Sequence, residues 1–229
     1  MARRAVPSFR ILWQQHETLY QRLFCAALER LAEDRCDITE ENAISERLCP
    51  ILSALCFEAS GRKNCEIPTP DWEKPIQPVV ESELKGGRGA KRPDFTCKRT
   101  NPFAVSADEH EIPFHVECKR LGTSAGSGWV LNENYVTNGI KRFDCAIHQY
   151  GKRASSGMMI GYVLGMSPQI ILSEVNAYQR HHCPNNPEIV FNFDGRTVEE
   201  CEQRLKREHV QPWNFKLIHL WVNLKKKET

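Results

Sequence analysis

Residues 112–122 read IPFHVECKRLG, and the interpretation of the chain starts from this stretch. Polar His115, Glu117 and Lys119 alternate with apolar residues, which is the period of a β-strand. Side chains of a strand alternate between faces, so these three point one way while Phe114 and Cys118 point the other. The stretch therefore predicts a strand with one apolar face and one face that carries chemistry.

A second carboxylate lies upstream, in Arg92-Pro93-Asp94-Phe95, where another strand is expected. Two carboxylates on neighbouring strands can hold a hard divalent cation through oxygen. The ammonium of Lys119, on the same face as Glu117, can orient the attacking water and offset phosphate charge. The pattern is typical of metal-assisted cleavage of phosphodiester bonds.

Pro93-Asp94 and Glu117-Cys118-Lys119 together resemble the signature of the PD-(D/E)xK nuclease superfamily. The resemblance implies a three-layer, restriction-endonuclease-like α/β core in the order αβββαβ, with a central mixed sheet flanked by helices. It also implies a Mg²⁺-dependent or Mn²⁺-dependent DNA nuclease, expected to be an endonuclease, with Asp94 and Glu117 as metal ligands and Lys119 as a catalytic residue. A bacterial defence or restriction system would suit such a protein.

The chain contains a second match with the same letters, Pro70-Asp71 followed by Glu83-Leu84-Lys85. The superfamily places a helix after the strand that carries the Glu-x-Lys element. A glycine-rich turn follows Lys85, whereas a loop and a helical pattern follow Lys119. The context favours the later pair.

Members of the superfamily often have a further acid on the first core helix, which is expected here to start near Asp37. On a helical wheel Glu41 lies close to the apolar stripe, while Glu46 points nearly opposite. Glu41 is therefore the preferred third catalytic and metal-binding acid, with Glu40 next. These glutamates are equally well explained as surface residues near the helix dipole.

Hydrophobic periodicity and turn residues predict the remaining elements. Helices are expected at 8–33, from 37 with a kink or break at Pro50, at 136–150, at 168–182 and from 197 to about 209. Strands are expected at 79–84, 93–97, 112–122, 158–164, 189–193 and 215–224. The predicted organisation is an amphipathic N-terminal helix extension (1–36) and one nuclease-like domain (37–229), with its core at about 37–164 and a helix and strand elaboration at 165–229.

Composition describes an ordinary globular chain, with 41% hydrophobic and 26% charged residues among 229. It shows no apolar run long enough for a membrane span and no secretion signal, so a cytoplasmic protein is expected. Ten cysteines without a C-x-x-C pair favour buried free thiols over disulfides. His181-His182-Cys183 lacks a partner pair for a zinc site.

The net charge of +2 does not by itself indicate nucleic-acid binding. Six basic residues between Lys85 and Arg99 nevertheless surround the single acid Asp94, which predicts phosphate-attracting charge beside the site. The candidate nucleic-acid contacts are Arg88, Lys91, Arg92, Arg142 and Gln149.

DNA is expected as the partner more than RNA, and the N-terminal helix offers a surface for a homodimer or a larger complex. The alternative function is a catalytically inactive nuclease-fold module that binds nucleic acid or a protein.

Overall fold

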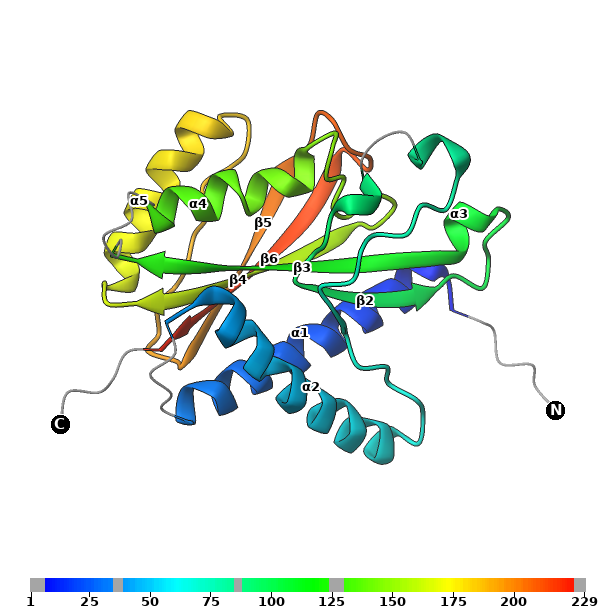
Figure 1. Ribbon diagram of the computed structural model, residues 1–229, viewed down its shortest axis with the longest axis horizontal. Helices are drawn as coiled ribbons and strands as arrows, with labels where there is room; N and C mark the ends of the chain where they lie inside the picture. The colour runs from blue at the N-terminus through cyan, green and yellow to red at the C-terminus, as the bar shows by residue number, and fades with distance from the viewer. Residues whose placement is uncertain (1–6, 35–38, 85–87, 124–129, 225–229) are drawn as a thin grey trace.

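A computed structural model describes residues 7–34, 39–84, 88–123 and 130–224. The chain forms an α/β fold around an open, mixed, six-stranded sheet with the order β1-β2-β3-β4-β6-β5. Helices cover both faces of this sheet, α1 and α2 on one side and α4 and α5 on the other (Figure 1). The expected α/β class with a central mixed sheet between helices is confirmed at this level.

The sheet combines antiparallel and parallel pairs. Its strands are β1 (Asp71–Trp72), β2 (Phe95–Thr100), β3 (Glu111–Gly122), β4 (Ser156–Leu164), β5 (Val198–Lys206) and β6 (Asn214–Asn223). Antiparallel pairing joins β1 to β2, β2 to β3, and β5 to β6, whereas β4 runs parallel to both β3 and β6. β4 lies in the middle of the sheet with helices on both faces, which explains its nearly continuous apolar sequence.

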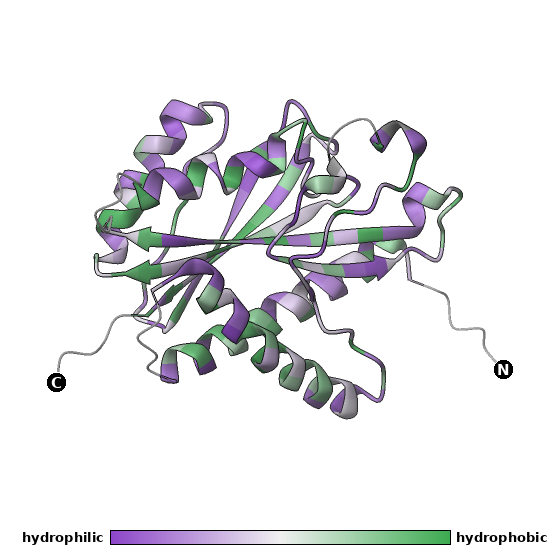
Figure 2. Cartoon of the chain, viewed as in Figure 1, coloured by the Kyte–Doolittle hydropathy of each residue, from purple (hydrophilic) through white to green (hydrophobic). Residues whose placement is uncertain are grey.

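The helices are α1 (Phe9–Glu33), α2 (Glu41–Lys63), α3 (Ala107–His110), α4 (Leu131–Thr137) and α5 (Pro168–His182), with 3-10 helices η1 (Glu81–Glu83), η2 (Arg88–Ala90) and η3 (Ile140–Asp144). Helix α1 matches its prediction, and its buried side chains recur at helical spacing within the same core as α2 and the sheet. Helix α5 also matches, with the Ser167 side chain accepting a hydrogen bond from Ile170 N. Hydrophobic residues follow the strands and the inward sides of α1 and α2 (Figure 2).

Helix α2 begins four residues later than expected, at Glu41, and it runs through Pro50 as one helix. Asp37, near which it was expected to start, lies outside the described residues. Its expected stripe is buried at Ile44, Leu48 and other positions. The late start places Glu41 in the first turn, where its side chain reaches the edge of the sheet.

The strand expected at 79–84 is wrong. The chain there forms η1, because the Glu83 carboxylate turns back to accept a hydrogen bond from Val79 N at 2.9 Å. Glu83 is buried between Lys152 and Arg153, at 2.7 and 2.6 Å. The first strand is instead the short β1, outside the predicted range.

The continuous helix expected at 136–150 is also wrong, because the chain breaks near Gly139 into α4 and η3. The backbone at Gly139 passes very close to the sheet. A Cβ placed there would lie 2.3 Å from Tyr135 O and 2.4 Å from Met159 Cε. The break turns η3 so that Arg142 reaches β3.

Two expectations for the C-terminal region fail. Residues 189–193 form no strand, because the Asn176 side-chain amide takes both backbone groups of Ile189, at 2.9 Å each. The helix expected from Thr197 is the edge strand β5, which pairs with β6 along its whole length. Thr197 and Glu200 have the spacing of a capping box, but strand pairing outweighs this local signal.

Candidate metal and nucleic-acid site

Strand β3 positions the two central residues of the candidate site, Glu117 and Lys119. Their side chains leave the sheet on the face covered by α4, while Phe114, Val116 and Cys118 belong to the core under α1 and α2. The polar face is buried as well, because Glu117 is 0% and Lys119 5% exposed. Charges at such depth require partners.

The unpaired edge of β3 positions the other two acids. Strand β2 pairs with β3 only as far as Val116, so beyond this point the β3 amides that face β2 need other acceptors. Asp94 Oδ2 accepts from Cys118 N at 2.5 Å, and Glu41 Oε2 accepts from Arg120 N at 3.0 Å. The two carboxylates thus continue the edge where the neighbouring strand ends.

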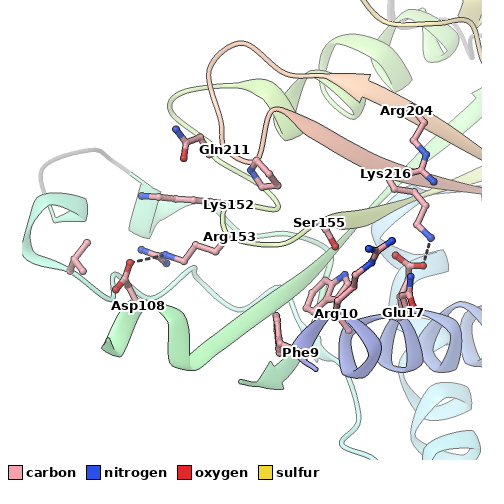
Figure 3. A pocket seen from close by; sticks show the side chains of 14 residues that line it. Phe9, Arg10, Glu17, Asp108, Lys152, Arg153, Ser155, Arg204, Gln211 and Lys216 are labelled. Atoms are coloured by element: carbon pink, nitrogen blue, oxygen red, sulfur yellow. Dashed lines mark hydrogen bonds and ion pairs between the residues drawn. The ribbon is translucent and has the colours of Figure 1, made fainter. Parts of the chain in front are cut away.

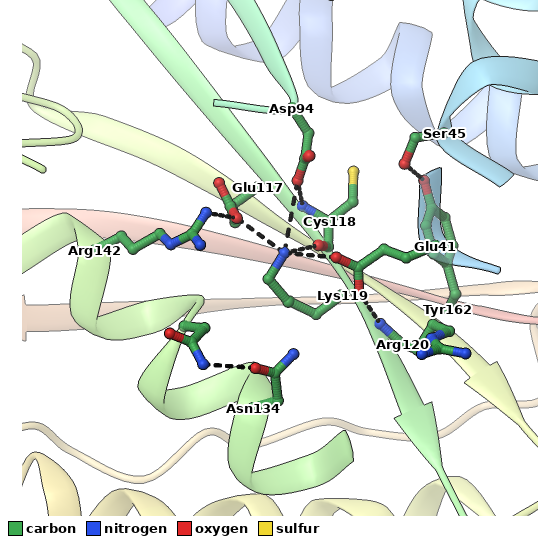
Figure 4. A network of polar contacts seen from close by, with 11 residues as sticks. Glu41, Ser45, Asp94, Glu117, Cys118, Lys119, Arg120, Asn134, Arg142 and Tyr162 are labelled. Carbon is green, nitrogen blue, oxygen red and sulfur yellow. Dashed lines mark hydrogen bonds and ion pairs between the residues drawn. The ribbon is translucent and has the colours of Figure 1, made fainter. Parts of the chain in front are cut away.

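Lys119 lies at the centre of the acids (Figure 4). Its Nζ is 2.8 Å from Glu41 Oε1, 2.9 Å from Glu117 Oε1 and 3.9 Å from Asp94 Oδ2. The ammonium also donates to Cys118 O at 2.5 Å. One ammonium therefore gathers carboxylates from α2, from the residue before β2, and from β3.

Arg142 reaches the same cluster from η3. Its guanidinium donates to Glu117 Oε1, the oxygen that Lys119 also contacts. Glu117 Oε2 is buried and has no hydrogen-bond partner in the described part of the chain. Among those residues, the second oxygen of this fully buried carboxylate therefore lacks a hydrogen-bond donor.

Burial and mutual repulsion raise the carboxyl pKa values. For Glu117, burial and then the charge of Asp94 outweigh Lys119 and Arg142 and raise the pKa to about 8. Burial is also the main cause that raises the pKa of Asp94. For Lys119, burial would lower the pKa, but Glu117, Asp94 and Glu41 together raise it, so the side chain is held as an ammonium. Among the described side chains, the cluster contains three carboxyl groups but only two cationic groups, Lys119 and Arg142.

These residues fit a hard divalent cation in chemical type. Three carboxylates supply oxygen ligands, and the partnerless Glu117 Oε2 is an acceptor that a cation would satisfy. Their oxygens converge on Lys119, however, and no group of three or more His, Cys, Asp or Glu in the described ranges already forms a metal-binding arrangement. That statement also covers His181-His182-Cys183. A cation would therefore have to compete with the ammonium or bind beside it.

The structure distinguishes the three candidate third acids by position. Glu41 contacts Lys119 and the β3 edge, as described above. Glu40 is exposed and lies 3.7 Å from the Arg120 guanidinium, and Glu46 is exposed on α2. Only Glu41 of the three reaches the cluster, although its role there stays a prediction.

The alternative pair is not assembled in this way. Asp71 lies in β1 and contacts Lys74 at 2.5 Å on the surface, whereas Glu83 is enclosed by Lys152 and Arg153. Lys85 lies outside the described residues. The structure thus brings Asp94 and Glu117 together at Lys119, whereas it places Asp71 and Glu83 in separate ion pairs.

The structure places the five expected nucleic-acid contacts in different surroundings. Arg142 belongs to the cluster through Glu117, and both Arg142 and Lys91 lie near His148, whose pKa is lowered to about 4 by burial and then by their charges. Gln149, with a φ of 52°, donates to Ala146 O at 2.8 Å, and its buried Oε1 has no hydrogen-bond partner within the described ranges. Arg92 is exposed, and the side chain of Arg88 is not described.

Two of the six basic residues expected around Asp94, Lys98 and Arg99, lie away from it. Lys98 and Arg99 pair with Pro113 and Ile112, at the far end of β2 from Asp94, and Lys98 contacts Glu111 at 2.9 Å. The sequence pattern did not predict the contact between Arg142 and Glu117. It predicted one continuous helix, whereas the chain turns between α4 and η3 and this turn brings Arg142 to β3. The pattern also did not identify the amides of Cys118 and Arg120 as anchors of the acids.

His115 was expected on the same face of β3 as Glu117, and there it contacts Gly151 and Tyr150. Its Nδ1 accepts from Gly151 N at 3.0 Å, and its ring packs against Tyr150. Nine described cysteines are free, and Cys56 and Cys118 are buried as expected, while Cys145 is partly exposed.

A cavity of about 840 Å³ lies apart from the cluster, and none of the cluster's five charged side chains lines it (Figure 3). Lys152, Arg153 and Lys216 lie in its wall, but Glu83 and Glu17 already engage them. These three cationic groups of the wall are therefore already paired within the protein.

No helix in the described ranges is long and apolar enough to cross a membrane. Comparison with family models, curated proteins and solved structures gave no match.

Proposed function

We propose that this chain is a Mg²⁺-dependent or Mn²⁺-dependent nuclease with a restriction-endonuclease-like core, and that it hydrolyses phosphodiester bonds of DNA internally. The observation that carries the proposal is the convergence of Asp94, Glu117 and Glu41 on the Lys119 ammonium. These side chains come from α2, from the residue before β2 and from β3. Two of the acids are fixed by backbone amides of the β3 edge rather than by chance surface pairing.

The order of elements supports the finer fold. A helix, α2, precedes the antiparallel strands β1, β2 and β3, which are followed by α4 and the parallel strand β4. This is the αβββαβ order that the resemblance implied. The first of the three strands is only two residues long, and β5 and β6 extend the sheet beyond the core.

Each side chain has a chemical role in this proposal. Asp94, Glu117 and Glu41 would hold the divalent cation, which when bound supplies a Lewis acid and lowers the pKa of its water. Lys119 positions the nucleophile and offsets charge on the scissile phosphate, since its raised pKa keeps it an ammonium. Arg142 and Lys91 supply positive charge where the nucleic-acid backbone would approach.

One observation favours the second candidate, a catalytically inactive nuclease-fold module. The cluster is internally paired, since Lys119 and Arg142 form ion pairs with its acids, so the same network can serve as a purely structural ion cluster. Such a module would bind nucleic acid or a protein partner without cleaving. A protein partner was expected to dock on α1. The apolar side of α1 already packs in the core, so such a partner would contact the remaining, more polar side of the helix.

The deciding experiment is incubation of the purified chain with supercoiled DNA, linear DNA and RNA, with and without Mg²⁺ or Mn²⁺. The proposal expects metal-dependent nicking of supercoiled DNA that is lost in Asp94→Asn. The matched control is Asp71→Asn, which removes the acid of the alternative pair from a surface ion pair and should cleave normally. Nucleic-acid binding without cleavage would favour the inactive module, and equal cleavage by both variants would remove Asp94 from the site.

A further inference from the structure

Two cations share one oxygen of Glu117. Lys119 Nζ and the Arg142 guanidinium both contact Oε1, while Oε2 is buried without a hydrogen-bond partner among the described residues. A carboxylate has about four acceptor positions over its two oxygens, so this arrangement places both cations at one oxygen and leaves the acceptor positions of the other without a hydrogen-bond donor among the described residues. Figure 4 shows Lys119 and Arg142 converging on the same carboxylate from two sides.

The two cations are held very differently. Lys119 projects from the middle of β3, its side chain is 6% exposed, and Glu41 and Cys118 O hold its ammonium as well as Glu117. Arg142 projects from the short helix η3, and its side chain is 25% exposed. Within the described residues the Arg142 guanidinium has Glu117 as its single side-chain partner, and its Nε is buried without a hydrogen bond. Of the two, Arg142 is the cation that can leave.

We propose that Arg142 couples nucleic-acid binding to cation binding, by leaving Glu117 for a backbone phosphate and so releasing the carboxylate to the divalent cation. This inference rests on the proposed function. A guanidinium binds two phosphate oxygens at once with favourable geometry, which compensates for the lost contact with Glu117. Its departure removes a positive charge that would repel a divalent cation at the same carboxylate.

The coupling acts in both directions, because linkage of two binding events is reciprocal. Without nucleic acid, Arg142 competes with the metal for Glu117. Removal of the guanidinium should therefore tighten metal binding by about tenfold and weaken metal-free DNA binding. Damage to the fold would weaken both, so a gain in metal affinity separates the competing role from a merely structural one.

The test is a calorimetric titration of Ca²⁺ into wild type and Arg142→Gln, with and without a short DNA duplex. Lys141→Gln is the matched control, because it removes the same charge from the adjacent, exposed residue. Thermal unfolding of each variant checks that the fold is intact.

The duplex should tighten Ca²⁺ binding to wild type and Lys141→Gln by about tenfold, whereas Arg142→Gln should bind tightly from the start and gain less. Equal Ca²⁺ affinities of wild type and Arg142→Gln without DNA would overturn the coupling by Arg142 while leaving the proposed metal site intact. Absence of Ca²⁺ binding to every variant, with or without DNA, would instead remove the metal site itself, and the proposed function with it.

Discussion

The Asp94 carboxylate accepts a hydrogen bond from the backbone N–H of Cys118 at 2.5 Å, at the point where β2 stops pairing with β3. Two residues further along the same edge, Glu41 accepts from Arg120 N. An exposed strand edge needs acceptors for its amides, and here carboxylates provide them. The same contacts fix both acids beside Glu117 and Lys119, so the end of one strand pair creates the candidate site.

Replacement of Lys119 by methionine should abolish cleavage while nucleic-acid binding remains. The ammonium is expected to be worth about 10²–10⁴-fold in rate as a positioned catalytic group. Gel-shift and cleavage assays measure the two properties separately. Lys74→Met, which removes a lysine from a surface ion pair, is the control and should change neither. Undiminished cutting by Lys119→Met would contradict the assignment.

Glu41→Gln should weaken Mn²⁺ binding by about 10–100-fold, the usual effect of losing a supporting acid around a metal. The glutamine retains an oxygen for Arg120 N, so the fold should persist. Glu46→Gln, on the same helix but exposed, is the control. Calorimetry with Mn²⁺ reports the affinities. Equal affinities of the two variants would show that Glu41 is an ordinary surface glutamate.

The metal-free protein should lose stability as pH rises towards 9. The folded-state pKa of Glu117, about 8, lies above its ordinary value of 4.5, so its contribution is fully present below 4.5 and is lost as pH rises through 8. The raised pKa of Asp94 acts in the same direction.

Glu117→Gln removes the ionisable group and should flatten this dependence. At pH 9, in the presence of a chelator, the free energy of unfolding of this variant should exceed that of wild type by a few kcal/mol. The reason is that one pKa unit corresponds to about 1.4 kcal/mol. Chemical unfolding at pH 5 and pH 9 measures the difference. A variant that is less stable than wild type at pH 9 would show that the paired carboxylate is net stabilising.

Gly139→Ala should destabilise the fold by about 1–3 kcal/mol, because the added Cβ would meet Tyr135 O and Met159 Cε at contact distances too short to tolerate. The strain should also move η3 and weaken the contact between Arg142 and Glu117. Gly61→Ala in α2 is the control, since nothing lies within 4 Å of its Cβ, and it should be neutral or stabilising by up to about 1 kcal/mol. Thermal unfolding compares the two, and equal melting temperatures would contradict the account.

Part of this protein follows from the sequence alone. The periods of α1 and β3 are local properties, carried by which residues are apolar, so α1 at 9–33 and β3 at 111–122 could be predicted to within a residue. The proximity of Asp94 to Glu117 also follows, because consecutive strands usually pair. The helical wheel selected Glu41 since the same side of α2 that packs on the core reaches the sheet edge.

Tertiary structure decided the rest. The segment at 198–206 has a helix-capping signal, yet it is a strand because the open edge of β6 offers a full ladder of backbone hydrogen bonds. The break at Gly139, which delivers Arg142 to Glu117, depends on the close approach of η3 to β4. A local pattern encodes the period of an element, but pairing partners and burial come from residues far apart in the chain, and these determine which charges finally meet.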